Sequence, residues 1–219
     1  MLSSRAVDPE IEMLHHVPPS LHALVAHGVL RTYRKGTLII DEGSHGDTLY
    51  VVLKGHVKAF SSDARGREVT YGVYGAGEYF GEMSLDGGPR SASVMAMHAT
   101  TCAVLARQTL RSYIAANPDF AFELISRVIH RARAATINAR NMALLDVYGR
   151  VVQLLDSLAS PPVDGVRLLN ERLTHADIAA RVGCSREMVS RLLKDLERGG
   201  YTEQRQRQLV LLRRLPPRW

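Results

Sequence analysis

The pattern of hydrophobic and polar positions changes twice along the chain. From residue 33 to residue 105, short runs rich in β-branched and aromatic residues alternate with glycine turns. The runs are 37–40, 48–53, 56–60, 69–74 and 92–96, and the glycines are Gly36, Gly43, Gly46, Gly55, Gly66 and Gly77. Short strands at regular spacing with turn residues between them predict an antiparallel barrel or sandwich. Before them, residues 1–30 predict one or two short helices with a break at Pro18-Pro19.

Residues 118–145 then predict one long helix, because the segment has no internal proline or glycine and exceeds the average helix length. Hydrophobic and small residues recur along it at alternating steps of three and four, which is the rhythm of a coiled-coil seam. The seam comprises Ile125, Val128, Ala132, Ala135, Ala139 and Met142. Its alanine centre would let two such helices approach closely, so we expect a homodimer. The alternative, that this face packs on the chain's own barrel, stays open.

A third pattern begins near residue 173. As a helix, 184–194 separates a polar face from an apolar face. The apolar face has Val189, Leu192, Leu193 and Leu196, and the polar face has Arg186, Glu187, Ser190, Arg191 and Lys194. Arginine can bind guanine through two hydrogen bonds, and glutamate can accept from cytosine in the major groove. The polar face therefore suits base edges, although for this helix taken alone an ordinary amphipathic helix with a solvated charged face is the more frequent case.

The residues before this helix favour DNA binding. Segment 173–183 predicts a short helix with Thr174 as N-cap and Asp177 near its positive end. Gly183 supplies a tight turn, Ser185 can cap the next helix, and Gly199-Gly200 can end it. Residues 201–212 fit a small β-hairpin. Together these features predict a winged helix-turn-helix.

Charge and composition support this prediction and exclude several other classes. The net charge is +6, and residues 174–219 contain ten lysines and arginines against five acidic residues, hence +5. A basic surface there attracts phosphate. The two cysteines and nine histidines show no metal-ligand spacing, and no nucleophile–base pair or phosphate-binding loop of a nucleotide hydrolase is visible. We expect no metal and no catalytic residue, and, without a signal peptide or membrane span, a cytoplasmic protein.

A candidate anion site lies in 81–92. Glycines near Arg90 and Ser91 can expose backbone N–H groups to a phosphate, and Arg90 can bind it through two hydrogen bonds. The carboxylate of Glu82 can accept a hydrogen bond from a ribose hydroxyl. Taken alone, an acidic residue and an arginine eight residues apart, as Glu82 and Arg90 are, more often form an ion pair within a loop.

The order of barrel, long helix and winged helix-turn-helix resembles the bacterial cyclic AMP receptor protein family, which is related to the fumarate-nitrate regulators. Three segments carry the resemblance, which covers essentially the whole chain: 81–92, the hinge 144–150 and 182–187. It implies an α+β fold with a nucleotide-binding β-roll at 1–117, a dimerisation helix at 118–145 and a DNA-binding domain at 146–219. It also implies a pocket in which Gly81, Glu82, Arg90 and Ser91 hold the ribose and cyclic phosphate, with Arg131 bracing Glu82.

Two departures from the family bear on the ligand. The loop before Arg90 is two residues shorter and contains Pro89. The family's Thr-Ser pair, which contacts the base, is represented by Ala135-Thr136, so one hydroxyl is missing. Losing one such bond costs about 0.5–1.5 kcal/mol, which weakens selection of adenine without abolishing it. Cyclic AMP is the expected effector. Cyclic GMP, cyclic di-GMP and a pocket that needs no ligand stay open, as does a haem sensor, whereas the absence of a cysteine cluster argues against an iron–sulfur switch.

We interpret the chain as a sequence-specific transcription regulator, not an enzyme, controlled allosterically by a cyclic nucleotide. By resemblance, Arg186, Glu187 and Arg191 would read a palindrome of half-sites beginning TGTGA, whereas Lys194, Arg205 and Arg207 would contact phosphate. RNA polymerase is an expected partner, through surface loops that composition does not identify. A different class, a cyclic-nucleotide module that docks on a partner protein, is the alternative.

Overall fold

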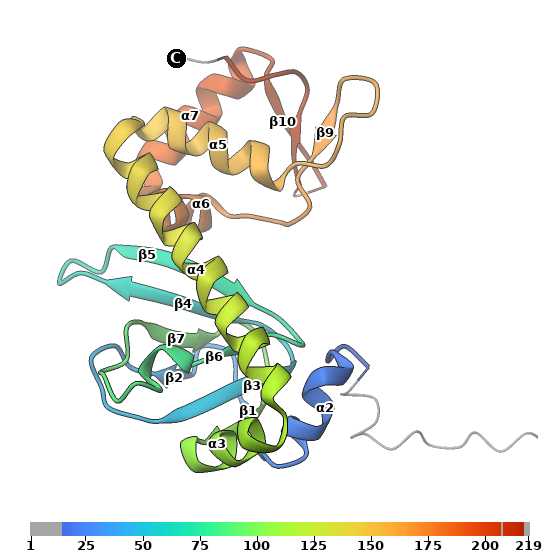
Figure 1. The fold of residues 1–219 in the computed structure, drawn as a ribbon. Helices are drawn as coiled ribbons and strands as arrows, with labels where there is room; N and C mark the ends of the chain where they lie inside the picture. Colours follow the sequence, from blue (N-terminus) through green and yellow to red (C-terminus); the bar gives the residue numbers. More distant parts are fainter. Residues whose placement is uncertain (1–14, 207, 217–219) are drawn as a thin grey trace, which may run out of the picture. The chain divides into compact units, whose positions relative to one another are not determined.

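The computed structural model describes residues 15–206 and 208–216 (Figure 1). They form two compact units, which are described separately below. The first comprises the described residues up to Ser61 together with Thr70–His130, and the second comprises Ser62–Val69 and the described residues from Arg131 onward. Helix α4, Pro118–Leu144, contributes to both units, since its first half lies in one and its second half in the other.

The first unit is built around two four-stranded sheets, with strand orders β1-β8-β3-β6 and β2-β7-β4-β5. Strand β3 pairs antiparallel with β8, and β4 pairs antiparallel with β7. The elements are α2 Pro19–Val25, β1 Val29–Tyr33, β2 Leu38–Ile40, β3 Thr48–Lys54, β4 Val57–Ser62, β5 Glu68–Tyr74, β6 Tyr79–Phe80, the 3₁₀ turn η1 Glu82–Ser84, β7 Ser93–Ala96, β8 Thr100–Ala106 and α3 Arg107–Ala116. The predicted antiparallel β-roll is confirmed.

Alternation along β3 shows how this unit buries two cores. Successive side chains of a strand point to opposite faces of its sheet. Leu49 and Val51 therefore join α2, α3 and Phe120 of α4 in one cluster. Val52, from the other face, joins Ile40 of β2 and residues of β4 and β7 in a second cluster between the sheets. One face of the first sheet is thus covered by helices, and the other by the second sheet.

The predicted long helix is also confirmed, because α4 is a single helix of 27 residues that ends at Leu144. Phe120 near its start is buried. Most side chains beyond it are exposed on the single chain. Most of α4 after Phe120 is therefore not covered by the described residues of its own chain.

The second unit has the winged helix-turn-helix predicted from the sequence. Its elements are α5 Val147–Leu158, β9 Arg167–Leu168, α6 His175–Val182, α7 Arg186–Arg198, β10 Thr202–Arg205 and β11 Gln208–Leu211. Strands β10 and β11 form the expected hairpin, and β9, which sequence analysis did not predict, adds a third antiparallel strand beside β11. The core contains Val151, Leu155, Ile178, Val189 and Leu196. Among the described residues, no helix is long and apolar enough to cross a membrane.

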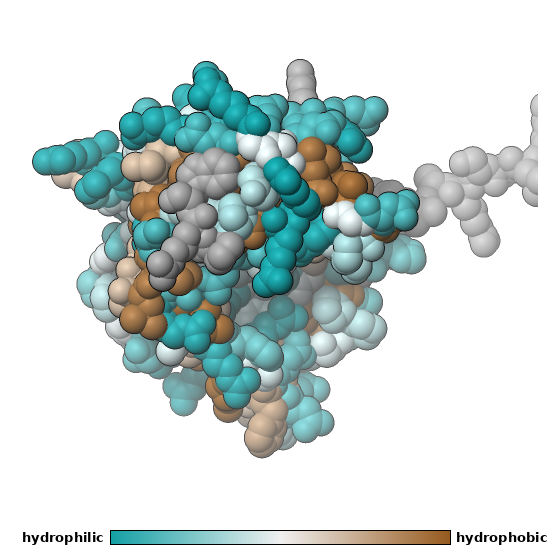
Figure 2. Space-filling model, turned by 90° about the horizontal axis from the view of Figure 1, so that it is seen from above, coloured by the Kyte–Doolittle hydropathy of each residue, from teal (hydrophilic) through white to brown (hydrophobic). Residues whose placement is uncertain are grey.

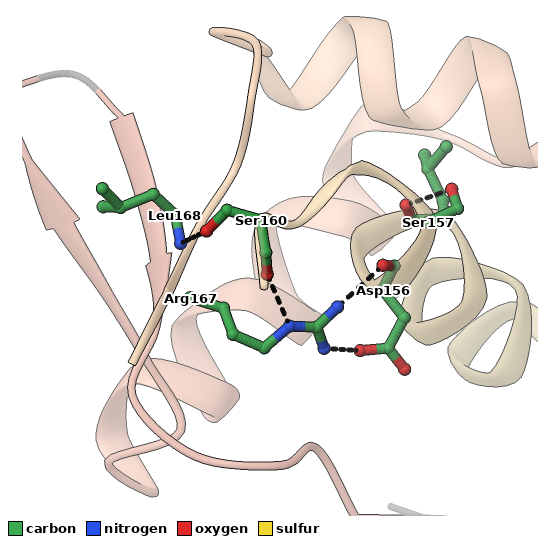
Figure 3. A network of polar contacts seen from close by, with 6 residues as sticks. Asp156, Ser157, Ser160, Arg167 and Leu168 are labelled. Atoms are coloured by element: carbon green, nitrogen blue, oxygen red, sulfur yellow. Dashed lines mark hydrogen bonds and ion pairs between the residues drawn. The ribbon is translucent and has the colours of Figure 1, made fainter. Parts of the chain in front are cut away.

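A polar network fixes β9 to the end of α5 (Figure 3). Arg167 donates from Nη1 to Oδ1 of Asp156 at 2.6 Å, from Nη2 to the Asp156 carbonyl oxygen at 2.9 Å and from Nε to the Ser160 carbonyl oxygen at 3.2 Å. The hydroxyl of Ser160 in turn accepts from the Leu168 backbone N–H at 3.1 Å. These bonds hold the short third strand in register, although strand pairing there covers only two residues.

Candidate ligand site and nucleic-acid interface

The segment predicted to hold an anion, 81–92, starts with a turn whose first residue is the glycine Gly81. Gly81 follows β6 with φ 89° and ψ 2°, in the left-handed region, and caps η1. A Cβ atom at this position would lie 2.7 Å from the Thr48 carbonyl oxygen and 2.8 Å from Nη1 of Arg90. Gly81 is therefore required both by its backbone conformation and by the close approach of the Arg90 guanidinium.

Arg90 is buried, with only 6% of its surface exposed. Nη1 donates to the carbonyl oxygens of Gly81 at 2.8 Å and Thr48 at 3.1 Å, and Nη2 donates to the carbonyl oxygen and Oγ1 of Thr48 at 3.1 and 3.0 Å. Burial lowers the pKa of the Arg90 guanidinium, and the charges of Tyr50, Asp47 and Glu82 act in the opposite direction by raising it. These bonds engage both Nη groups of Arg90. To bind a phosphate through two hydrogen bonds, Arg90 must therefore use its Nε–H and, in addition, share or give up one of its hydrogen bonds to Thr48.

The loop 43–48 belongs to this site, which sequence analysis missed. Arg90 donates its backbone N–H to the Ser44 carbonyl oxygen and accepts from the Gly43 N–H, both at 2.8 Å. A Cβ at Gly46 would lie 2.9 Å from Nη2 and 3.2 Å from Nε of Arg90, so glycine leaves this edge of the guanidinium uncovered. The glycines at 43 and 46 had indicated turns only, because nothing local links them to residue 90.

The other predicted ligand residues of the first unit differ in exposure. Glu82 is buried, whereas Ser91 is exposed and its hydroxyl makes only a weak contact, 3.7 Å, with Sδ of Met83. The Ser91 hydroxyl is therefore available to a stronger acceptor. Beneath Gly81, the ring of Tyr50 stacks on Phe80 with centroids 4.8 Å apart and nearly parallel planes, which makes a flat apolar support.

Arg131 and Thr136 fall in the second compact unit, so their predicted approach to Glu82 and to the base stays a prediction. Arg131 is half-buried. Thr136 is exposed and donates its hydroxyl hydrogen to the Ala132 carbonyl oxygen at 3.0 Å. The Thr136 oxygen can therefore still accept a hydrogen bond, whereas Ala135 offers none.

The seam on α4 is exposed along its whole length. Ile125 is 53% exposed, Val128 39% and Met142 51%, and Ala132, Ala135 and Ala139 are exposed as well. Ile125 and Val128 lie in the same unit as the β-roll yet remain uncovered by it, which weighs against the alternative that this face packs on the chain's own barrel. Met142 also approaches the turn after α6, because its Cε lies 2.6 Å from the position that a Cβ at Gly183 would take.

The helix-turn-helix has the local structure that its sequence predicted. Thr174 and Asp177 form a full capping box at α6, with Thr174 Oγ1 accepting from the Asp177 N–H at 3.1 Å and the Asp177 carboxylate accepting from the Thr174 N–H at 2.8 Å. Gly183 takes the left-handed conformation, φ 67°, and Ser185 caps α7 by accepting from the Met188 N–H at 3.2 Å.

The two faces of α7 separate as expected, with one exception. Val189, Leu193 and Leu196 are buried and Leu192 is half-buried, whereas the predicted base- and phosphate-contacting residues Arg186, Glu187, Arg191 and Lys194 are exposed. Ser190, predicted to face DNA with them, is half-buried and its hydroxyl lies 2.8 Å from Nδ1 of His175. Figure 2, a space-filling view turned by 90° from that of Figure 1, shows a mostly hydrophilic surface with smaller apolar patches.

On the wing, Arg205 is already paired. Its guanidinium binds the Glu203 carboxylate at 2.5 and 3.1 Å. Contact with a DNA phosphate would therefore compete with Glu203. Arg207, the second wing residue predicted to touch phosphate, lies outside the described residues.

Arg150 joins the predicted hinge to the end of α6, a role that the sequence did not indicate. Its Nη1 donates to the Leu145 carbonyl oxygen at 2.9 Å, and its Nε donates to the Val182 carbonyl oxygen at 2.8 Å. Asp146 caps α5 by accepting from the Gly149 N–H at 2.7 Å. The Arg150 side chain thus bridges Leu145, between α4 and α5, and Val182, which precedes the Gly183 turn.

Comparisons with known proteins match both parts of the chain. Residues 30–117 match the model of the cyclic nucleotide-binding domain, and residues 149–215 match that of the Crp-like helix-turn-helix domain. The chain is 34% identical to the cAMP-activated global transcriptional regulator CRP of Salmonella typhimurium over 82% of this chain and 87% of that protein. It is 33% identical to the cAMP-activated global transcriptional regulator Vfr of Pseudomonas aeruginosa, over 90% and 96% of the two chains.

Solved structures agree on the fold. The c-di-GMP responsive global regulator CLP of Xanthomonas campestris superposes with a TM-score of 0.75 at 27% identity, covering 92% of this chain and 97% of that one. CprK in complex with OCPA superposes with a TM-score of 0.75 at 18% identity, over 90% of this chain and 92% of CprK, and at that identity supports the fold alone.

Proposed function

The chain belongs to the family of cyclic AMP receptor proteins and fumarate-nitrate regulators, and we propose that it works as a homodimer whose reading of DNA is switched by cyclic AMP. Its class is that of a cyclic-nucleotide-binding, DNA-binding transcription regulator. In the proposed division of labour, residues 1–117 bind the nucleotide, 118–145 dimerise and 146–219 bind DNA.

One observation carries the choice of ligand class. Arg90 is a buried cation in a glycine-lined turn of the cyclic nucleotide-binding domain, beside the buried Glu82. A buried guanidinium is stabilised by an anion that can accept several of its hydrogen bonds. A cyclic phosphate offers such oxygens, the Ser91 hydroxyl can donate one more bond, and Glu82 is an acceptor for the ribose hydroxyl.

The proposed contact of Thr136 with the base favours a ligand with an amino group. The hydroxyl hydrogen of Thr136 is used on Ala132, so Thr136 Oγ1 acts as an acceptor. Adenine carries an exocyclic amine at the position where guanine carries a carbonyl oxygen, so an acceptor there selects adenine. The curated relatives at 33–34% identity are described as cAMP-activated, which points the same way.

Cyclic di-GMP is the second candidate ligand, and one finding favours it. The regulator CLP, which shares 27% identity and the fold over 92% of this chain, is described as responsive to c-di-GMP. The absence of a hydroxyl at Ala135 removes one contact that would distinguish adenine. Ligand identity is tested by calorimetric titration of the full-length protein with cyclic AMP, cyclic GMP and cyclic di-GMP. Cyclic AMP should bind most tightly, and preferential binding of either guanine nucleotide would overturn the assignment.

The proposed switch couples ligand to DNA through α4. A ligand shifts an equilibrium between two states only if it contacts them differently. Arg131 and Thr136 on α4 are the residues proposed to supply that difference. Met142 and Arg150 give α4 and the hinge direct contacts with the end of α6 and its turn, so a shift of α4 would move the reading helix α7.

In the proposed dimer, two copies of α7 read a palindrome. The exposed Arg186, Glu187 and Arg191 are proposed to contact bases in half-sites beginning TGTGA, and Lys194 to contact phosphate. Once on DNA, the protein is proposed to contact RNA polymerase.

A further inference from the structure

His175 and Ser190 join the two helices of the helix-turn-helix. His175 is the first residue of α6, Ser190 lies in the middle of α7, and Nδ1 of the imidazole is 2.8 Å from the Ser190 hydroxyl. The chain has no other histidine after His130. Ser190 was predicted to contact DNA directly, but its hydroxyl is engaged by this ring.

The bond places the imidazole beside the polar face of α7. Residues three or four apart on a helix are neighbours on its surface, so Ser190 lies between Arg186 and Glu187 on one side and Lys194 on the other. All three of these neighbours are exposed. When a recognition helix enters the major groove, the helix before it crosses the DNA backbone. A side chain at the start of α6 that borders the α7 face therefore lies where phosphates pass.

We propose that His175 is a phosphate ligand in the DNA complex, that Ser190 is its positioning residue, and that protonation of His175 strengthens DNA binding at low pH. The inference rests on the proposed DNA-binding function. Ser190 occupies Nδ1, which leaves Nε2 for the DNA. In the neutral ring with the hydrogen on Nε2, Nδ1 accepts from the Ser190 hydroxyl and Nε2 donates a neutral hydrogen bond. In the imidazolium, both nitrogens donate, Ser190 accepts, and the bond to phosphate becomes charge-assisted.

The sign of the effect follows from the negative charge that DNA brings to the ring. On α6, the Asp177 carboxylate is already bonded to Thr174, and on α5 both charged residues are engaged elsewhere, Arg150 with backbone carbonyls and Asp156 with Arg167. On α7, the charged residues around Ser190 are Arg186, Glu187, Arg191 and Lys194. Binding DNA adds a phosphate next to Nε2, so the complex takes up a proton, and affinity rises as the pH falls.

The experiment measures DNA affinity of the full-length protein with cyclic AMP by fluorescence anisotropy, from about pH 6 to pH 8, where histidines titrate. Two duplexes are used, one with an inverted repeat of TGTGA and one scrambled. The variants are His175→Gln, which cannot be protonated, His175→Lys, which stays charged, and Ser190→Ala, which removes the positioning bond. His98→Gln, an exposed histidine of the β-roll, is the matched control.

Wild type and His98→Gln should bind both duplexes roughly three- to tenfold more tightly at the low end of the range, because a phosphate contact is independent of sequence. His175→Gln should lose this gain on both duplexes, His175→Lys should bind tightly at every pH, and Ser190→Ala should show a reduced gain. A pH profile of His175→Gln that matches wild type would overturn the inference while leaving the proposed function intact. Absence of any DNA binding by wild type would instead defeat the proposed function.

Discussion

Nη1 of Arg90 donates a hydrogen bond to the carbonyl oxygen of Gly81 at 2.8 Å, which closes the two ends of the candidate ligand turn on each other. The same guanidinium holds Thr48, which is 42 residues away in the sequence. The turn is therefore organised around Arg90 before any ligand arrives, and such preorganisation lowers the ordering cost of binding.

Substitution of Gly81 tests this arrangement. Gly81→Ala would place a methyl group 2.8 Å from Nη1 of Arg90 and force alanine into φ 89°. Nucleotide affinity should fall at least about tenfold, because the guanidinium must move. Gly87→Ala is the matched control, since Gly87 has φ 97° but nothing within 4 Å of its ideal Cβ. Both variants should lose about 1–2 kcal/mol of stability from backbone strain, and only Gly81→Ala should lose affinity in calorimetry. Equal affinities of the two variants would contradict the arrangement.

Arg90 itself should prove both a ligand residue and a support of its loops. Arg90→Leu removes charge-assisted bonds of roughly 1.5–3 kcal/mol each to the ligand, so nucleotide affinity should fall at least about tenfold. It also leaves the carbonyl oxygens of Thr48 and Gly81 without their donor, so the melting temperature followed by circular dichroism should decrease. Arg90→Lys keeps the charge but not the planar fork, and should recover little of either property. Wild-type affinity in the leucine variant would rule out this site.

The features that could be predicted from the sequence are those determined by residues close together along the chain. The Thr174–Asp177 capping box, the left-handed Gly183 and the Ser185 cap are local, so residue type and spacing were sufficient. The partners of Arg90 and the His175–Ser190 bond were not predictable, because they depend on how loops and helices pack across 42 and 15 residues of sequence. The Glu203–Arg205 pair was not predicted, although it could have been, since residues two apart on a strand share a face. How α4 residues meet the ligand remains a prediction.

The α4 seam should be a dimer interface. Ala135→Glu would put two like charges at the closest approach of the paired helices, where desolvation adds to their repulsion. Analytical ultracentrifugation should show a shift from dimer to monomer at micromolar concentration. Ala134→Glu, at an exposed alanine on the other side of the helix, should remain dimeric. If both variants sediment as dimers, the seam has been assigned to the wrong face.

Two residues of α7 should affect DNA binding in different ways. Arg186→Ala removes a proposed base contact and should cost about 1–3 kcal/mol per half-site, with specificity relaxed at one guanine. Lys194→Ala removes a proposed phosphate contact, so it should lower the affinity for specific and scrambled duplexes equally. It should also reduce the slope of log affinity against log salt concentration by about one unit. Anisotropy titrations over a salt series measure both effects. Equal losses on the two duplexes for Arg186→Ala would defeat the base-reading assignment.

The central claim, that a cyclic nucleotide switches DNA binding, is tested most directly by titrating the full-length wild-type protein into a labelled duplex that carries an inverted repeat of TGTGA, with and without cyclic AMP. We predict salt-dependent binding that is tighter with the nucleotide, and weaker on a scrambled duplex. DNA affinity that is unchanged by cyclic AMP, cyclic GMP and cyclic di-GMP alike, or no binding to either duplex with any of them present, would contradict the account.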